Sequence, residues 1–196
     1  SGEGVNCKNI GEFIRRIAID YVRYDYVRYV IREIPEGKDL IAIDRKLRAH
    51  YDVISCRTAR MRRRQKQQAI VQYIRYGHSF VLLATEGAHD QFERLKSYNC
   101  RTTPLQVKSY SIGLKNQRVI VCVRYEVWSK NVRYFERLAL HDIHKVEGKL
   151  NALPYCHFPG VVRQKQNLVF QNNQRRSLAG LPLVTLAPRT KDLWCE

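Results

Sequence analysis

The chain has 196 residues, of which 44% are hydrophobic and 27% charged, so it can bury the core of one domain and is not wholly disordered. Thirty-five lysines and arginines against 18 acids give a formal net charge of +17. Such a field attracts polyanions at long range and argues against a metabolic enzyme that works free in the cytosol. We therefore expect nucleic acid, DNA or RNA, as the partner.

Neither a membrane span nor a signal peptide is visible in the sequence. No apolar run is long enough to cross a bilayer. The six cysteines are widely spaced and include no C-x-x-C pair, which favours free thiols. We expect an intracellular protein, in the cytoplasm or nucleoid, with no membrane partner.

The first half of the chain alternates between helical and strand patterns. Residues 8–22 have apolar side chains at helical spacing, and residues 24–33 are rich in tyrosine and valine, which favour strand. Asp39 can cap a helix that ends near Tyr51, and Ser55 can cap the next helix. Two β-rich runs, 69–76 and 79–86, are separated only by Gly and His and predict a hairpin.

The second half begins with a further pair of strands. Residues 105–114 and 117–128 follow Pro104, and the second run alternates apolar and polar side chains. Residues 131–153 have apolar positions at steps of three and four, which predicts one long helix. A weaker helical pattern follows Pro159 to about residue 176.

This order predicts an α+β fold, with an antiparallel sheet of about five strands in a ferredoxin-like (split βαβ) core and additional N- and C-terminal helices. We expect a single domain, 1–196. Its parts are an N-terminal helical segment 1–23, an α+β core 24–130, C-terminal helices 131–178 and a tail 179–196. Helices on one face would leave the other face of the sheet open.

The strongest functional signal is a basic segment joined directly to the hairpin. Between Asp52 and Glu86 the sequence has no acid. Arginine and lysine neutralise phosphates, and tyrosine or tryptophan can stack unpaired bases. The nucleic-acid-binding candidates are Arg57, Arg60, Arg62, Arg63, Arg64 and Lys66 on the helix, Tyr73, Arg75, Tyr76 and His78 on the hairpin, and Arg124 and Trp128 on the last strand.

The tripeptide aliphatic-Arg-Tyr occurs five times in the chain, for example as Ile74-Arg75-Tyr76 and Val123-Arg124-Tyr125. On a strand, alternation places the arginine opposite its two neighbours. We therefore expect the aliphatic and tyrosine side chains in the core and the arginines on the open face of the sheet.

Catalysis is an alternative that the sequence supports less than binding. A metal nuclease needs clustered carboxylates, for which Glu86 and Asp90 are the nearest candidates. Strand-transferring enzymes with a tyrosine nucleophile pair a sheet with a His-hydrophobic-His motif, which this chain lacks. We therefore expect no enzyme, no catalytic residues that can be named, and no cofactor.

Two further interpretations stay open. The basic segment suits a structural subunit of a ribonucleoprotein, with protein partners in the complex. A role in a mobile-element, replication or RNA-processing complex would fit a small basic protein. A zinc site built from His141, His144, Cys156 and His157 is less favoured, because adjacent residues rarely both reach one ion; we expect no metal.

Overall fold

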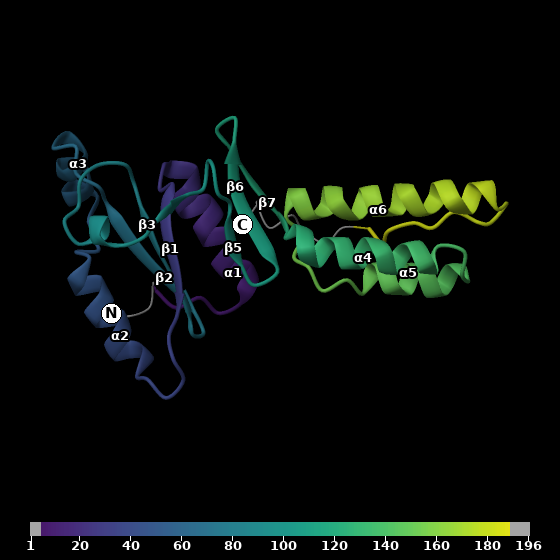
Figure 1. Cartoon of the computed structure of the whole chain (residues 1–196), viewed down its shortest axis with the longest axis horizontal. Helices are drawn as coiled ribbons and strands as arrows, with labels where there is room; N and C mark the ends of the chain where they lie inside the picture. Colours follow the sequence, from purple (N-terminus) through teal and green to yellow (C-terminus); the bar gives the residue numbers. More distant parts are fainter. Residues whose placement is uncertain (1–4, 189–196) are drawn as a thin grey trace. The chain divides into compact units, whose positions relative to one another are not determined.

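The structure is a computed structural model, and it describes residues 5–188. The chain divides into two compact units, one of Ser1–Val107 with Ile112–Val119 and one of Lys108–Ser111 with Ile120–Glu196. It contains antiparallel sheets of four and three strands among helices (Figure 1), so the predicted α+β class is confirmed. The single domain that we expected stays a prediction.

The first unit holds the whole four-stranded sheet. Its elements are helix α1 (Ile10–Arg15), continued by a π-helix (Arg16–Tyr21) and a 3-10 turn (Val22–Tyr24), strand β1 (Arg28–Glu33), helices α2 (Leu40–His50) and α3 (Arg57–Gln65), strands β2 (Val71–Tyr76) and β3 (Ser79–Ala84), a 3-10 turn (Phe92–Arg94), and strands β4 (Tyr98–Asn99) and β5 (Leu105–Val107). The first strand therefore begins four residues later than we expected, because helix continues through Tyr24.

The remaining elements are strands β6 (Tyr110–Lys115) and β7 (Arg118–Val123) and helices α4 (Tyr125–Leu138), α5 (Ile143–Asn151) and α6 (Pro159–Leu178). The three-stranded sheet has the order β5-β6-β7, and the division between the units runs through it.

The four-stranded sheet has the order β2-β3-β1-β4. Both β1 and β2 run antiparallel to β3, and β4 runs antiparallel to β1. The register places Tyr76 opposite Ser79, so Gly77 and His78 form a two-residue turn, and Gly77 has the positive φ (56°) that such turns require. The predicted hairpin is confirmed.

Helices cover both faces of this sheet, so the open face that we expected is wrong. On one face Leu40, Ile43 and Leu47 of α2 pack against a core that includes Val71 and Tyr73. On the other face lies α1, and Figure 1 shows the sheet between these two helices. Every residue of β3 is buried, and so are the first five of β2. Continuous burial is typical of a strand packed on both sides.

The second unit packs its helices around a separate core, in which Phe135, Leu138, Val146, Leu150 and Leu168 are buried. The single helix expected over 131–153 is wrong, because Asp142 caps a new helix with hydrogen bonds to the amides of His144 and Lys145. The strand expected to residue 128 ends at Val123, and α4 begins two residues later. The valines of this stretch fit both a strand and the buried stripe of a helix.

Candidate nucleic-acid interface

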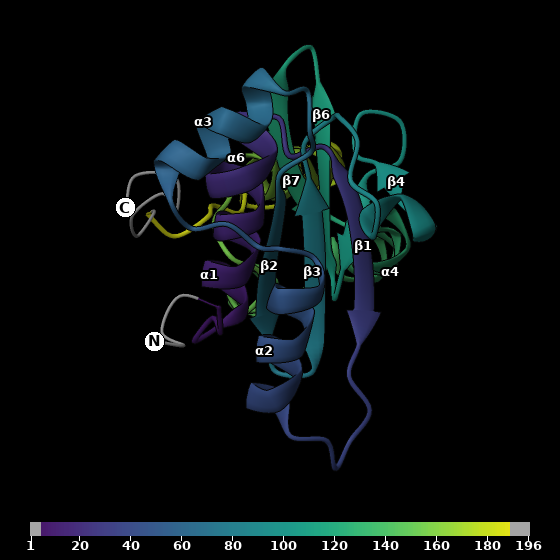
Figure 2. The same ribbon diagram turned by 90° about the vertical axis from the view of Figure 1, so that its left-hand side faces the viewer.

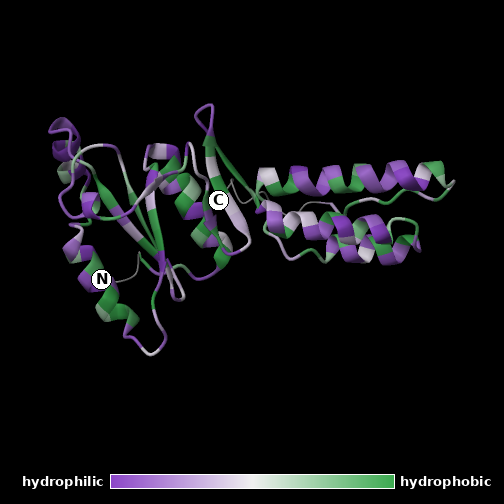
Figure 3. Cartoon of the chain, in the orientation of Figure 1, coloured by the Kyte–Doolittle hydropathy of each residue, from purple (hydrophilic) through white to green (hydrophobic). Residues whose placement is uncertain are grey.

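Helix α3 carries five arginines in nine residues and no acid. None of its residues is buried, and Met61, its one large apolar side chain, is 53% exposed. Figure 3 shows the helix mostly in the colour of hydrophilic residues, unlike the strands beside it. The predicted basic helix is therefore confirmed, but apolar packing does not hold it.

Polar contacts hold α3 on the first unit instead. The guanidinium of Arg63 forms an ion pair with Asp52 and donates to the carbonyl of Ala69 (3.4 Å). The amide of Gln68 donates to the carbonyl of Arg63 (2.9 Å), which closes the C-terminal turn. The helix starts at Cys56 without a side-chain cap, so the Ser55 cap that we expected is wrong.

Gly87 fixes the segment that follows α3. Its φ is +124°, and a β-carbon there would lie 2.6 Å from the carbonyl oxygen of Gln67 and 2.7 Å from the amide nitrogen of Ala69. Only glycine allows this approach. The amide of Ala69 donates to the carbonyl of Ala88 (2.9 Å), so the C-terminal end of α3 is tied to the end of β3.

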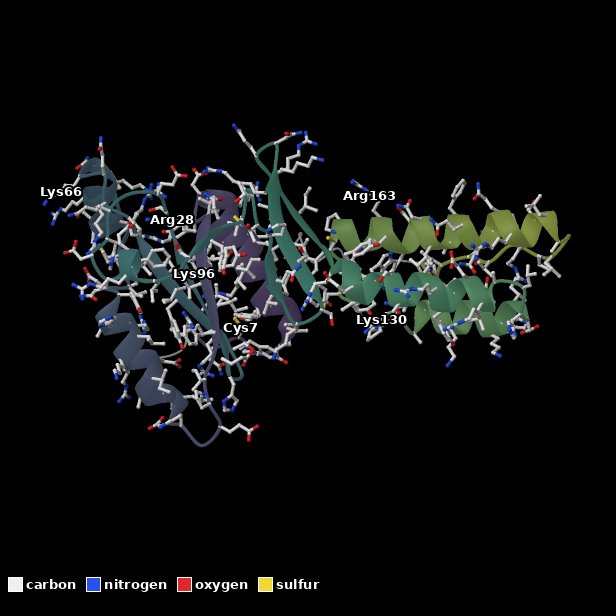
Figure 4. The ribbon with its side chains drawn as sticks, viewed as in Figure 1. Cys7, Arg28, Lys66, Lys96, Lys130 and Arg163 are labelled. Atoms are coloured by element: carbon white, nitrogen blue, oxygen red, sulfur yellow. The ribbon has the colours of Figure 1, made fainter. Side chains whose placement is uncertain are left out.

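The other cations of α3 and its C-terminal cap are accessible to a ligand. Arg57, Arg62, Arg64 and Lys66 are exposed, Arg60 is half-buried, and none of the five forms an ion pair within residues 5–188. Figure 4 shows Lys66 at the outer end of the helix. The outer surface of α3 is therefore a dense set of uncompensated charges.

Two of the predicted hairpin residues, Tyr73 and Arg75, are buried and hydrogen-bonded within the fold. Arg75 is 4% exposed, and its Nε and Nη2 each donate to a carboxylate oxygen of Asp44 at 2.8 Å. The hydroxyl of Tyr73 donates to the same carboxylate (2.6 Å). The hydrogen bond to Asp44 raises the pKa of Arg75, and burial raises that of Tyr73. The alternation was predicted correctly, but α2 covers the face on which Arg75 lies.

The other predicted residues are dispersed. Tyr76 is half-buried against Phe13, with the ring centroids 6.0 Å apart, and the exposed His78 donates from Nδ1 to the carbonyl of Ile34 (2.9 Å). Arg124 and Trp128 belong to the second unit. Arg124 directly precedes α4 and Trp128 lies on it, so neither is on a strand. Trp128 packs against Tyr155, with the ring centroids 6.1 Å apart. The structure therefore brings the helix cations together but does not gather the tyrosines around them.

Sequence reasoning overlooked a cleft of about 510 Å³ beside β1. It is lined by Tyr29, Val30, Ile31, Arg32, Lys96, Tyr98, Thr103, Pro104 and Gln106. Tyr98 is 44% exposed. The centroid of its ring lies 5.9 Å from that of Tyr29 and 5.9 Å from the ammonium of Lys96. The available signal was Lys96-Ser97-Tyr98, a cation next to an aromatic in an acid-free stretch.

The side chains considered for catalysis are not assembled. Glu86 pairs with Arg101 (2.8 Å), and Asp90 is exposed. His89 donates from Nε2 to the carbonyl of Tyr51 (3.0 Å) and accepts the amide of Phe92 on Nδ1 (3.2 Å), so both ring nitrogens hold the fold. Among residues 5–188, no group of three or more His, Cys, Asp or Glu side chains is placed to hold a metal ion.

No protein-family model matches the chain, and no curated protein and no solved structure is similar to it. None of the helices in the described part of the chain has the length and apolar character needed to span a bilayer.

Proposed function

We propose that this protein binds nucleic acid, DNA or RNA, through the exposed cations of α3. The observation that carries the proposal is a helix with five arginines, no acid and no buried residue. Like charges repel within such a helix, and phosphates would remove that repulsion. Phosphate contacts carry no sequence information, so the proposed binding is independent of sequence and falls steeply with salt.

The fold of the first unit is the second part of the proposal. Strands β1 and β2 are both antiparallel to β3, which lies between them, so β1 and β2 are parallel and α2 and α3 connect them. We propose that this arrangement is the split βαβ half of a ferredoxin-like core. We propose that the first unit is such a core with its second half reduced, because only a 3-10 turn and the two-residue β4 follow β3. Fold alone does not imply function.

The decisive experiment compares two triple variants that each remove three positive charges. The test variant is Arg62→Gln, Arg64→Gln, Lys66→Gln on α3 and its C-terminal cap, and the control is Lys130→Gln, Arg137→Gln, Arg163→Gln on exposed positions of α4 and α6. Figure 4 labels Lys66, Lys130 and Arg163. Binding to single- and double-stranded DNA and RNA is measured by fluorescence anisotropy at several salt concentrations.

For the α3 variant we expect weaker binding and a smaller slope of log affinity against log salt. Each lost phosphate contact removes about 0.7 units of slope on single strands and about 0.9 on B-DNA. The control should keep the slope of the wild type. Equal reductions in both variants would mean that the net charge acts as a whole and that α3 is not the site.

Cys56 offers an independent measure of whether α3 is occupied. It is exposed at the start of the helix, and the backbone amides of Ala59 and Thr58 lower its pKa. Burial raises the pKa of Cys7 and of Cys100 to about 11. Iodoacetamide near pH 7.5 should therefore modify Cys56 well before these two thiols. Bound nucleic acid should slow that modification, and an unchanged rate at saturating ligand would contradict the proposal.

A further inference from the structure

The cleft beside β1 presents an aromatic ring whose position is fixed. Tyr98 pairs with Tyr29 across the two antiparallel strands β1 and β4. Tyr29 is 4% exposed, and its hydroxyl donates to the carbonyl oxygens of Thr103 (3.0 Å) and Pro104 (3.2 Å), which ties the far wall of the cleft to the sheet. Burial raises the pKa of Tyr29 to about 12, so it remains a donor at any physiological pH. The Tyr98 ring packs against that of Tyr29 in a tilted arrangement, and 44% of the residue remains accessible.

The charge of the cleft has one sign. Arg32 and Lys96 line it and are exposed, and none of the nine lining residues is acidic. Neither cation forms an ion pair within the described part of the chain. The Lys96 ammonium lies 5.9 Å from the Tyr98 ring centroid, within reach of a cation–π contact. An anionic group above this ring would meet two cations.

The cleft also contains the uncovered main chain of β1. The carbonyl of Val27 accepts from Cys100 on the β4 side, whereas the amide of Ile34 donates toward the β3 side. Because main-chain groups alternate along a strand, the amide and carbonyl of Ile31 face the same side as those of Val27. Strand β4 reaches only as far as Tyr29, so within residues 5–188 no strand pairs with β1 at Ile31 on this side.

We propose that this cleft binds one unpaired nucleotide, with its base stacked on Tyr98, its phosphate between Arg32 and Lys96, and a base edge on the main chain of Ile31. Stacking is open to every base because each has a π-face. The volume of about 510 Å³ is in the range of small-molecule sites. The inference rests on the proposed function, since it makes single-stranded nucleic acid the preferred ligand of the same unit. In Figure 2, α3 and β4 lie at opposite sides of that unit, so the cleft is a second site.

The test separates base contacts from phosphate contacts. A single-stranded oligonucleotide and an abasic oligomer with the same number of phosphates are bound to the wild type and to Tyr98→Ala, Tyr98→Phe and Tyr125→Ala. Tyr125 is the matched control, an 80% exposed tyrosine on α4. Thermal unfolding of each variant confirms that it is folded, and Tyr98→Phe keeps the ring if the alanine variant proves unstable.

We expect the wild type to prefer the base-bearing strand. Tyr98→Ala should lower its affinity for that strand roughly 5- to 150-fold, the range for loss of one stacked base, while its affinity for the abasic oligomer and the salt slope stay unchanged. Tyr98→Phe and Tyr125→Ala should behave as the wild type. If Tyr98→Ala does not lower the affinity, or lowers it equally for both oligomers, the inference is wrong.

The α3 triple variant distinguishes this inference from the proposed function. It should weaken the base-bearing and the abasic oligomer alike. Suppose that the α3 variant binds as the wild type while Tyr98→Ala loses affinity for the base-bearing oligomer alone. Binding through α3 would then be wrong, and the inference about the cleft would be supported. If only the α3 variant loses affinity, the helix is the site and the cleft is not.

Discussion

Helices α3 and α6 use basic residues in opposite ways. No residue of α3 is buried, whereas α6 buries Lys165, Asn172 and Arg176. Arg176 is 1% exposed and donates to the carbonyl oxygens of Pro182 (2.6 Å), Ala139 (2.9 Å) and His141 (2.7 Å). Since Ala139 follows the last residue of α4, this guanidinium satisfies carbonyls at a helix end. A net charge of +17 therefore overstates the charge available to a ligand.

The largest expected effect is the loss of Arg176. Arg176→Ala leaves three carbonyls without their donor, of which that of Ala139 is buried, and removes a fully buried guanidinium, so we expect the free energy of unfolding to fall by about 3–5 kcal/mol. Denaturant unfolding measures it. The neighbour Arg175 pairs with Glu136 (3.0 Å) with 44% of each side chain exposed, so Arg175→Ala should cost less than about 1 kcal/mol. Similar costs at both positions would remove the contrast between buried and exposed cations.

Asp44 tests the same contrast inside the first unit. Asp44→Ala leaves Arg75 and the hydroxyl of Tyr73 without their acceptor, and we expect a loss of about 3 kcal/mol in unfolding free energy. The matched control is Asp52→Ala, whose carboxylate pairs with Arg63 but is 63% exposed. It should cost less than about 1 kcal/mol. A cost for Asp52 as large as that for Asp44 would mean that the α3 contact also determines stability.

Replacement of Lys165 should raise the free energy of unfolding instead of lowering it, and the size of the gain should depend on pH. Burial lowers the pKa of Lys165 from 10.5, and the hydrogen bond of its ammonium among residues 5–188 is a long one, 3.5 Å to the carbonyl of Tyr155. Between the folded and unfolded pKa values the unfolded chain binds more protons, so stability rises with pH. Lys165→Met should stabilise the fold at pH 7 by on the order of 1 kcal/mol. That gain should shrink as the pH approaches 10.5, and a gain independent of pH would contradict a desolvated charge.

The smallest expected effect belongs to α3 itself. Without nucleic acid, Arg62→Gln, Arg64→Gln, Lys66→Gln should change the unfolding free energy by less than about 0.5 kcal/mol. Any change should be a stabilisation that fades with added salt, because repulsion between like charges is removed. Calorimetric unfolding at low and moderate salt measures it. A large loss of stability would show that these cations hold the fold.

The sequence predicts local structure well where one periodicity dominates. The hairpin, the helix capped by Asp39 and the basic helix all follow from turn residues, a cap and spacing. The end of β7 does not, because Tyr125 and Val127 suit a strand as well as the first turn of α4. The two-sided burial of the sheet was also not predictable, since it depends on where α1 and α2 pack.

The candidate site was predictable only in part. The charge of α3 is a property of nine consecutive residues and needs no tertiary information. The burial of Arg75 depends on Asp44, which lies 31 residues earlier, and no local pattern joins the two. The cleft at Tyr98 combines residues from β1 with residues of the 96–106 segment, so spacing along the chain could not reveal it.

The two edges of the four-stranded sheet differ, and this bears on self-association. The main chain of Arg75 on β2 pairs with Val5 and Cys7, so the chain's own N-terminal segment occupies part of that edge. The edge of β1 beyond Tyr29 has no strand beside it among residues 5–188. A sheet open at both edges can add copies without end, whereas one open edge can accept only one further strand. A second copy that paired along this stretch of β1 would use its unpaired main-chain groups, and the sheet could then extend only through the partly occupied edge at β2.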